Sequence, residues 1–188
     1  METSTLLIIC INFLLICTLP FYFFRADGKW NIRWLITALP FTLSPLVTIA
    51  TYLGKLESIM PISPCLEILA VILSLASISL MFLTIGTHRI PVSLWHQRPE
   101  DDEPDHIVTW GAYKLIRHPF YSSFIIAVLG NLLLTANIAS AAIFIYVIGI
   151  LNYTASMEEK RLANETGVIG EKYKDYLARS NRFFPTHL

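Results

Sequence analysis

Residues 119–157 read PFYSSFIIAVLGNLLLTANIASAAIFIYVIGILNYTASM and contain no Asp, Glu, Lys, Arg or His. As a single α-helix this stretch would be about 58 Å long, roughly twice the thickness of the hydrocarbon core of a bilayer. Thr135 and Asn137 interrupt the aliphatic run near its middle, where a turn fits. The stretch therefore predicts a tight hairpin of two membrane-spanning helices.

Three further uncharged runs precede the hairpin. They extend from Thr3 to Phe24, from Trp34 to Gly54 and from Ile68 to Thr87, and each is long enough to cross a bilayer once. Of the 188 residues, 54% are hydrophobic and only 15% are charged, and the mean hydropathy is +0.56. These values are typical of a membrane protein. The sequence predicts an all-α integral membrane protein with about five spans, three of them within residues 1–88.

Several functional classes find no support in the sequence. The formal net charge is zero, which gives no basic field for a nucleic-acid partner. The three cysteines, Cys10, Cys17 and Cys65, form neither a disulfide framework nor a metal motif. The acidic stretch EDDEPD at 100–105 is interpreted as a solvated connector, so no metal site is predicted. The N-terminus METSTLL lacks the basic start of a cleavable signal peptide, and the first run is expected to remain as a membrane helix.

Basic residues alternate between the predicted loops. The first loop, the third loop and the C-terminal tail carry most of them: Arg25, Lys29 and Arg33; Arg89, Arg98, Lys114 and Arg117; and Lys160, Arg161, Lys172, Lys174, Arg179 and Arg182. The second loop carries only Lys55. Because cytoplasmic loops are enriched in Lys and Arg, this pattern predicts an external N-terminus. The loop at 89–118 and a helical tail at 158–188 are then cytoplasmic.

The hairpin is expected to bring two charged clusters together. RHP at 117–119 precedes the uncharged run, and MEEKRL at 157–162 ends it. A hairpin returns the chain to the side that it left, so His118 and Glu158 are predicted to be neighbours at the cytoplasmic face. Taken alone, RHP also fits a membrane anchor and EEKRL also fits a solvated helix. Their juxtaposition favours a functional site, which Asn152 and Ser156 would extend into the bilayer as a polar wall.

The predicted site combines a carboxylate, an imidazole, a guanidinium and several tyrosines with an apolar wall. No GxGxxG, P-loop, HExxH or GxSxG motif is present. Methyl transfer from a sulfonium fits this set, since it needs alignment and exclusion of water but no metal. Two alternatives remain open: a sterol-type membrane reductase that uses NADPH, and a non-enzymatic membrane scaffold. Neither the site nor the composition predicts an oligomeric state.

Three segments carry a family resemblance. DHIVTWGAYKLIRHPFYSS at 105–123, EEKRL at 158–162 and GEKYKDYLARSNRFFP at 170–185 occur in this order. Together they resemble the isoprenylcysteine carboxyl methyltransferase family and its phospholipid methyltransferase relatives, whose shared pattern is close to LVxxGxYxxxRHPxY, EExxL, GxxYxxY and a closing R-x-x-P. The resemblance implies an integral membrane methyltransferase with S-adenosylmethionine as methyl donor and a lipophilic or small methyl acceptor.

The resemblance also implies a set of site residues. The residues carried over to the cofactor are Gln97, Ile107, Val108, Tyr113, His118, Pro119, Phe120, Tyr121 and Glu158. Arg117 and Glu159 are candidates for orienting or acid–base roles in catalysis. Prenylcysteine enzymes place a carboxylate-binding arginine four residues before the glutamate, and Thr154 stands there in this chain. Asn152 and Thr154 are therefore expected at the substrate, which could be a carboxylate, an amine or a thiol.

Overall fold

The computed structural model describes residues 2–17, 29–88, 107–164 and 168–185. Within these residues the chain forms six α-helices, one short 3-10 helix and no β-strand. The helices are α1 (Thr3–Cys17), α2 (Ile32–Tyr52), α3 (Pro64–His88), the 3-10 helix η1 (Gly111–Lys114), α5 (Pro119–Thr135), α6 (Ile138–Ala163) and α7 (Val168–Arg179). The all-α fold predicted from the sequence is confirmed.

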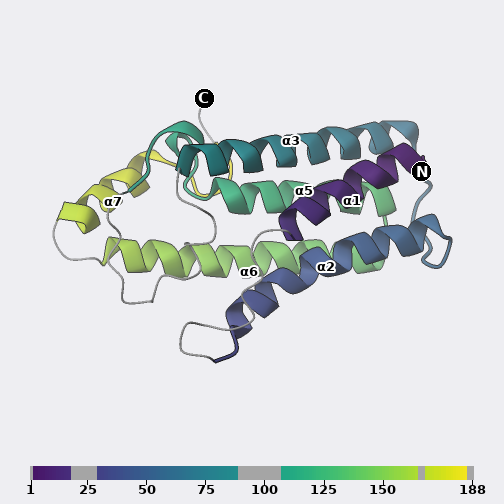
Figure 1. The fold of residues 1–188 in the computed structure, drawn as a ribbon, viewed down its shortest axis with the longest axis horizontal. Coiled ribbons are helices and arrows are strands. Elements are labelled where there is room, and N and C mark those ends of the chain that lie inside the picture. Colours follow the sequence, from purple (N-terminus) through teal and green to yellow (C-terminus); the bar gives the residue numbers. More distant parts are fainter. Residues whose placement is uncertain (1, 18–28, 89–106, 165–167, 186–188) are drawn as a thin grey trace.

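The five longer helices form an elongated bundle, and the short α7 lies at one end of it (Figure 1). The start of α1 and the turn between α5 and α6 lie at the opposite end (Figure 1). Helix α3 makes its most extensive contacts with α5. The end of α3, the start of α5 and the end of α6 therefore meet where η1 and α7 are located.

The predicted hairpin is confirmed, with its turn at Ala136 and Asn137. Ala136 adopts the left-handed conformation with φ 45°, and its N–H donates to the carbonyl of Leu132 to end α5. The Asn137 side chain caps α6 by accepting a 2.9 Å hydrogen bond from the N–H of Ser140. In return, the Asn137 N–H donates to the Ser140 hydroxyl at 3.4 Å. This reciprocal capping box satisfies donors at the helix start that would otherwise be unpaired. The second arm of the hairpin is longer than the uncharged run, since α6 continues past Met157.

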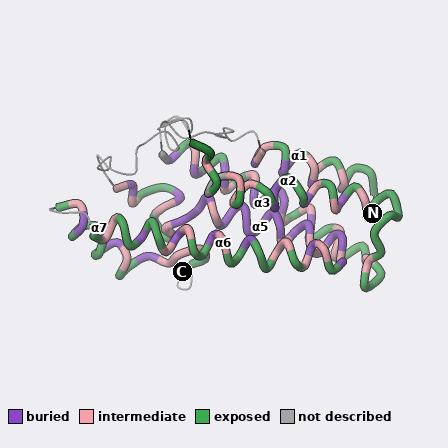
Figure 2. The backbone as a smooth tube through the Cα atoms, turned by 90° about the horizontal axis from the view of Figure 1, so that it is seen from below, coloured by how far each residue is buried: buried purple, intermediate pink, exposed green. Residues whose placement is uncertain are grey.

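Helix α5 is the centre of the bundle. Figure 2 shows buried positions along its length and exposed positions on the outer faces of the surrounding helices. These outer faces are apolar, as at Leu14, Leu46, Ile72 and Ile145, which are all more than half exposed. A polypeptide in water would not expose so many large aliphatic side chains, whereas a bilayer solvates them. The exposed surface therefore fits a protein whose solvent along these helices is lipid.

Three described helices are long and apolar enough to cross a membrane, namely α2, α3 and α6. Helices α1 and α5 are apolar but shorter, with 15 and 17 residues. The protein is thus a multi-pass membrane protein, and the expectation of about five spans stays a prediction for α1 and α5.

Helix α2 contains two prolines, and neighbouring helices compensate for both. Pro40 and Pro45 lack the N–H that would bond to the carbonyls of Ile36 and Phe41, four residues earlier. The hydroxyl of Tyr146 on α6 donates to the Ile36 carbonyl at 3.1 Å. The thiol of Cys17 on α1 donates to the Phe41 carbonyl at 3.7 Å. Prolines are tolerated in membrane helices when such partners satisfy the freed groups.

Buried polar side chains join the inner helices. Asn12 of α1 donates to the carbonyl of Ser74 on α3 at 3.4 Å and faces the hydroxyl of Ser77 at 3.3 Å. The Ser77 hydroxyl also lies 2.8 Å from the carbonyl of Ser123 on α5. Thr48 of α2 hydrogen-bonds to Asn131 of α5. Asn12 and Asn131 thus link helices, and such bonds are common between membrane helices.

Candidate functional site

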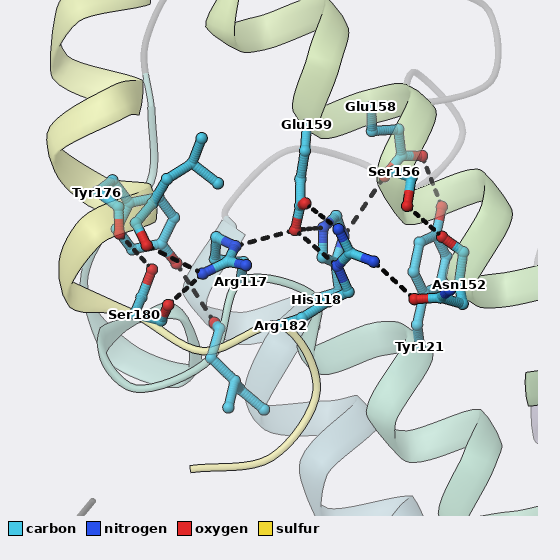
Figure 3. A network of polar contacts seen from close by, with 12 residues as sticks. Arg117, His118, Tyr121, Asn152, Ser156, Glu158, Glu159, Tyr176, Ser180 and Arg182 are labelled. Carbon is cyan, nitrogen blue, oxygen red and sulfur yellow. Dashed lines mark hydrogen bonds and ion pairs between the residues drawn. The ribbon is translucent and has the colours of Figure 1, made fainter. Parts of the chain in front are cut away.

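The two charged clusters predicted to meet do so at the α7 end of the bundle (Figure 3). Pro119 is the first residue of α5, where a helix needs no N–H donor, and His118 is the residue before it. Glu158 and Glu159 lie in the last turns of α6. The imidazole of His118 contacts both carboxylates, with Nδ1 3.4 Å from Glu158 Oε2 and Nε2 3.2 Å from Glu159 Oε1.

Glu159 is the hub of a buried ionic network. Its side chain is 9% exposed, and Oε1 accepts hydrogen bonds from Arg117 Nε at 2.9 Å and from Arg182 Nε at 3.1 Å. Its other oxygen, Oε2, accepts from Arg182 Nη2. With two guanidinium partners and the His118 ring, both oxygens of this carboxylate are occupied. The side chain can therefore orient the surrounding segments.

Glu158 has different surroundings, although it is the adjacent residue. Its side chain is 47% exposed, and Oε1 accepts a 2.6 Å hydrogen bond from the hydroxyl of Tyr121 on α5. The Tyr121 ring stacks on the His118 ring, with centroids 5.3 Å apart and planes inclined by 6°. Glu158, Tyr121 and His118 thus form one contiguous surface of carboxylate, phenol and imidazole. We refer to these three residues as the Glu158 face.

The His118 ring is held in its neutral form at pH 7. Burial lowers its pKa to about 4, because removal from water disfavours the charged ring. The Glu159 carboxylate opposes this shift, whereas Arg117 and Arg182 add to it. Burial also raises the pKa of Glu158 to about 7, so this carboxyl is partly protonated at pH 7, whereas hydrogen bonds from Arg182 and Arg117 hold the pKa of Glu159 below its usual range.

The C-terminal tail fixes the RHP segment from the other side. Residues 115–118 and 181–182 run parallel, with hydrogen bonds from Arg117 N–H to the Asn181 carbonyl at 2.7 Å and from His118 N–H to the Arg182 carbonyl at 3.1 Å. The Tyr176 hydroxyl donates to the Tyr113 carbonyl at 2.6 Å, and burial raises the pKa of Tyr176 to about 12. The RHP segment is therefore held by backbone bonds to the tail as well as by its own side chains.

The segment before RHP is anchored to the end of α3. Gly111 adopts φ 61°, and the nearest atom that a Cβ there would meet is Thr87 Oγ1 at 2.4 Å. Thr87 Oγ1 also accepts from the Ala112 N–H at 3.3 Å. Only glycine fits a left-handed position this close to another side chain. The anchor also places the Tyr113 side chain near Glu158. Burial raises the pKa of the Tyr113 phenol, and the charges of Tyr176 and Glu158 raise it further.

Of the remaining predicted residues, some lie at the site and others support it. Val108 and Phe120 are buried, and the Phe120 ring packs edge-on against Phe124 with centroids 5.7 Å apart. Asn152 is exposed and accepts a 2.6 Å hydrogen bond from Arg182 Nη1, while the Thr154 hydroxyl bonds to the carbonyl of Ile150 in its own helix. Ile107 is partly exposed, and Gln97 lies outside the described residues. Among the described residues, no group of His, Cys, Asp and Glu could hold a metal ion.

Arg182 was not among the predicted site residues, yet its side chain contacts Glu159 and Asn152 and its carbonyl accepts from the His118 N–H. In sequence it lies 23 residues after Glu159 and 30 after Asn152. The signal that could have identified it is the closing R-x-x-P of the tail, in which Arg182 is the arginine. Its contacts with α6 depend on how the tail turns back onto the hairpin.

Comparison with known proteins gives one family. The profile of the isoprenylcysteine carboxyl methyltransferase family matches residues 68–164, more than half of the chain. The match runs from the first turns of α3 to the end of α6 and includes the RHP segment and both glutamates. Among curated proteins, no sequence matches this chain.

Proposed function

This chain belongs to the isoprenylcysteine carboxyl methyltransferase family and is a membrane methyltransferase, and we propose that it transfers the methyl group of S-adenosylmethionine to a lipophilic or small acceptor. The observation that carries the proposal is the Glu158 face, where carboxylate, phenol and imidazole meet at the end of the hairpin. The family match supports neither a sterol-type membrane reductase nor a non-enzymatic scaffold.

The chemistry of the Glu158 face fits a sulfonium donor. S-adenosylmethionine supplies a methyl group on a positively charged sulfur. Burial raises the pKa of Glu158 to about 7, and a cationic donor beside it would favour the ionised carboxylate, while the faces of Tyr121 and Tyr113 add cation–π attraction. The neutral His118 ring adds no repelling charge. We assign the donor to these groups, together with the backbone around Ile107, Val108, Pro119 and Phe120, and with Gln97 from the preceding loop.

The acceptor is proposed to approach along α6 from the bilayer. Asn152 is exposed and lies one turn before Ser156, while the hydroxyls of Thr154 and Ser156 both donate to carbonyls of their own helix. Transfer proceeds by direct in-line displacement, in which the acceptor lone pair forms the new bond to carbon as the bond to sulfur breaks. Holding the two reactants in line away from water can lower the barrier by about 7 kcal/mol. A carboxylate acceptor needs no base, whereas an amine or a thiol must first lose its proton.

Arg117 and Glu159 are proposed to orient the site rather than to move protons. Each is already engaged: Arg117 donates to Glu159 and to the carbonyls of Leu177 and Ser180, and Glu159 accepts from two arginines. These bonds connect α6, the RHP segment and the tail. The geometry of the Glu158 face therefore depends on Arg117 and Glu159, although neither side chain contacts the donor or the acceptor.

The site is proposed to face the cytoplasm. Residues 1–88 would supply three spans, residues 119–157 the hairpin, and residues 89–118 and 158–188 the cytoplasmic loop and tail. This arrangement follows the alternation of basic residues and gives the polar donor access from the cytosol, where it is soluble. Lipophilic acceptors reach the same site through the membrane.

Calorimetric titration of the purified protein in detergent with S-adenosylmethionine tests the proposal. We expect saturable binding that weakens at least tenfold in Glu158→Gln, because the variant lacks the attracting charge. Glu171→Gln is the matched control, since Glu171 is an exposed acidic residue of α7. Radiolabelled methyl transfer into a membrane extract, separated into lipid, thiol and protein products, then identifies the acceptor. Binding of NADPH without binding of S-adenosylmethionine, or no binding of either, would contradict the proposal.

A further inference from the structure

Arg182 connects three parts of the site that are distant in sequence. Its carbonyl accepts from the N–H of His118 at 3.1 Å, which ties it to the RHP segment. Its guanidinium donates to Glu159 and Asn152, which both belong to α6. The residue itself belongs to the C-terminal tail, after the end of α7. One side chain and its own backbone therefore join the tail, the RHP segment and α6.

The guanidinium lies along one face of α6. Nε and Nη2 donate to the two oxygens of Glu159, which is a paired geometry that only arginine provides, and Nη1 donates to Asn152 Oδ1 at 2.6 Å. Asn152 and Glu159 are seven residues apart, or about two helical turns, and so share a face. Arg182 thereby places a positive charge beside a part of α6 that is uncharged in sequence. Its side chain is 31% exposed, compared with 12% for Arg117.

We propose that Arg182 is a positioning residue of the methyl-donor site: it holds Glu159, and through Glu159 it holds the His118 ring and the Glu158 face in place. The inference rests on the proposed function for the identity of the donor. The contacts that carry the inference are independent of the donor's identity. Glu159 Oε1 accepts from Arg182 and Arg117 and also contacts the His118 ring. Loss of Arg182 leaves this oxygen with Arg117 and His118 and removes the hydrogen bond to Oε2.

The charges around His118 make this role measurable. The ring faces Glu158 and Glu159 of α6, Arg117 of its own segment, Arg182 of the tail and the Tyr121 phenol of α5. The Phe183 ring, 6.1 Å away, adds no charge. Without Arg182, one of the two positive charges that disfavour a proton on His118 is lost, while the Glu159 carboxylate that favours it remains. The pKa of His118 should then move upward from about 4.

Nuclear magnetic resonance of histidine ring carbons tests the contact directly. The chain has five histidines, and the His118 signal is identified by its absence in His118→Gln. We expect Arg182→Met to raise the pKa of His118 and Arg182→Lys to leave it close to that of the wild type, because lysine keeps the charge. Arg179→Met is the matched control, since it removes an exposed tail arginine three residues away. An unchanged His118 titration in folded Arg182→Met would overturn the inference.

Donor binding provides the second readout. We expect Arg182→Met to weaken S-adenosylmethionine binding about tenfold, because Glu159 loses both hydrogen bonds from this guanidinium and no longer holds the Glu158 face in place. Arg182→Lys should recover only part of this loss, because a lysine cannot bind both oxygens of Glu159. Wild-type affinity in both variants would contradict a positioning role. If the wild type itself binds no S-adenosylmethionine, the proposed function fails, and the His118 titration still decides whether Arg182 positions the ring.

Discussion

The hydroxyl of Tyr121, in the first turn of α5, donates a 2.6 Å hydrogen bond to Oε1 of Glu158, in the last turns of α6. The bond closes the open end of the hairpin, between residues 37 apart in sequence. Oε2 of the same carboxylate lies 3.4 Å from His118 Nδ1, and the Glu158 side chain is still half exposed. The two arms of the hairpin are therefore joined by the same side chains that form the proposed donor site.

Tyr121→Phe should weaken binding of S-adenosylmethionine by roughly tenfold, because the variant removes the hydrogen bond that orients Glu158. The ring and its stacking on His118 are retained. Calorimetric titration measures the dissociation constant. Tyr146→Phe is the control, since that hydroxyl bonds to the Ile36 carbonyl on α2, and it should bind the donor as the wild type does. Equal affinities for Tyr121→Phe and the wild type would show that orientation of Glu158 by this hydrogen bond does not contribute to donor binding.

Tyr146→Phe should instead lower stability by about 1–2 kcal/mol, because the Ile36 carbonyl freed by Pro40 would lose its partner. Denaturant-induced unfolding in detergent micelles gives this difference. Tyr153→Phe is the matched control on the same helix, where the side chain is 62% exposed, and should change stability little. A Tyr146→Phe protein as stable as the wild type would show that Ile36 finds another partner.

Acidification should destabilise the protein through His118, while Glu158, whose pKa burial raises to about 7, acts in the opposite direction. The pKa of this ring is about 4 in the folded protein and 6.5 for an ordinary histidine, so between these values the unfolded chain binds more protons. Its contribution is therefore fully present above pH 6.5 and is lost as the pH falls towards 4. At pH 5 the loss is on the order of 2 kcal/mol. Between pH 7 and pH 5, His118→Gln should lose less stability, or gain more, than the wild type, and an identical pH dependence of the two proteins would contradict a buried neutral ring.

Gly111→Ala should destabilise the protein by roughly 1–3 kcal/mol, because the position needs a left-handed backbone and the new Cβ would collide with Thr87 Oγ1. Donor binding should weaken as well, since η1 carries Tyr113. Thermal unfolding and calorimetry measure the two effects. Gly149→Ala in α6 is the control, because a Cβ at that position would have no neighbouring atom within 4 Å. A stable, fully binding Gly111→Ala would show that the loop can shift without cost.

Cys65 provides a test of the proposed orientation. It is the exposed cysteine of the chain, at the start of α3, on the side proposed to be external. A membrane-impermeant maleimide should label it in intact cells, and Cys65→Ser should abolish this labelling. Lys174→Cys, placed in the Cys65→Ser background on the exposed side of α7, should be labelled only after permeabilisation. The reverse pattern would place the site on the external face.

The hairpin could be predicted from the sequence because its signals are local. An uncharged run twice too long for one helix must turn, and Thr135 and Asn137 mark where. The proximity of His118 and Glu158 then followed from topology alone, because the two arms begin and end at the same side. The family match covers two of the three segments on which the resemblance was based, 105–123 and 158–162, and ends before the third, 170–185.

The different environments of Glu158 and Glu159 could not be predicted in this way. The two residues are adjacent and chemically identical, so sequence gives no reason for one to be 47% exposed and the other 9%. Successive positions on a helix are about 100° apart, which turns Glu159 towards Arg117 and Glu158 towards Tyr121. The direction in which each one faces depends on how α6 is rotated against α5.

The sequence by itself determined the elements of this protein: apolar runs set the membrane helices, and charged residues at their ends set the place of the proposed site. Only the tertiary structure decided the partners, such as Arg182 for Glu159 and Tyr146 for the carbonyl freed by Pro40. The physical reason is that hydrophobic burial in a bilayer depends on composition over about 20 residues, and is therefore local. A hydrogen bond depends on two groups being placed within about 3 Å, and packing of the whole chain sets that distance.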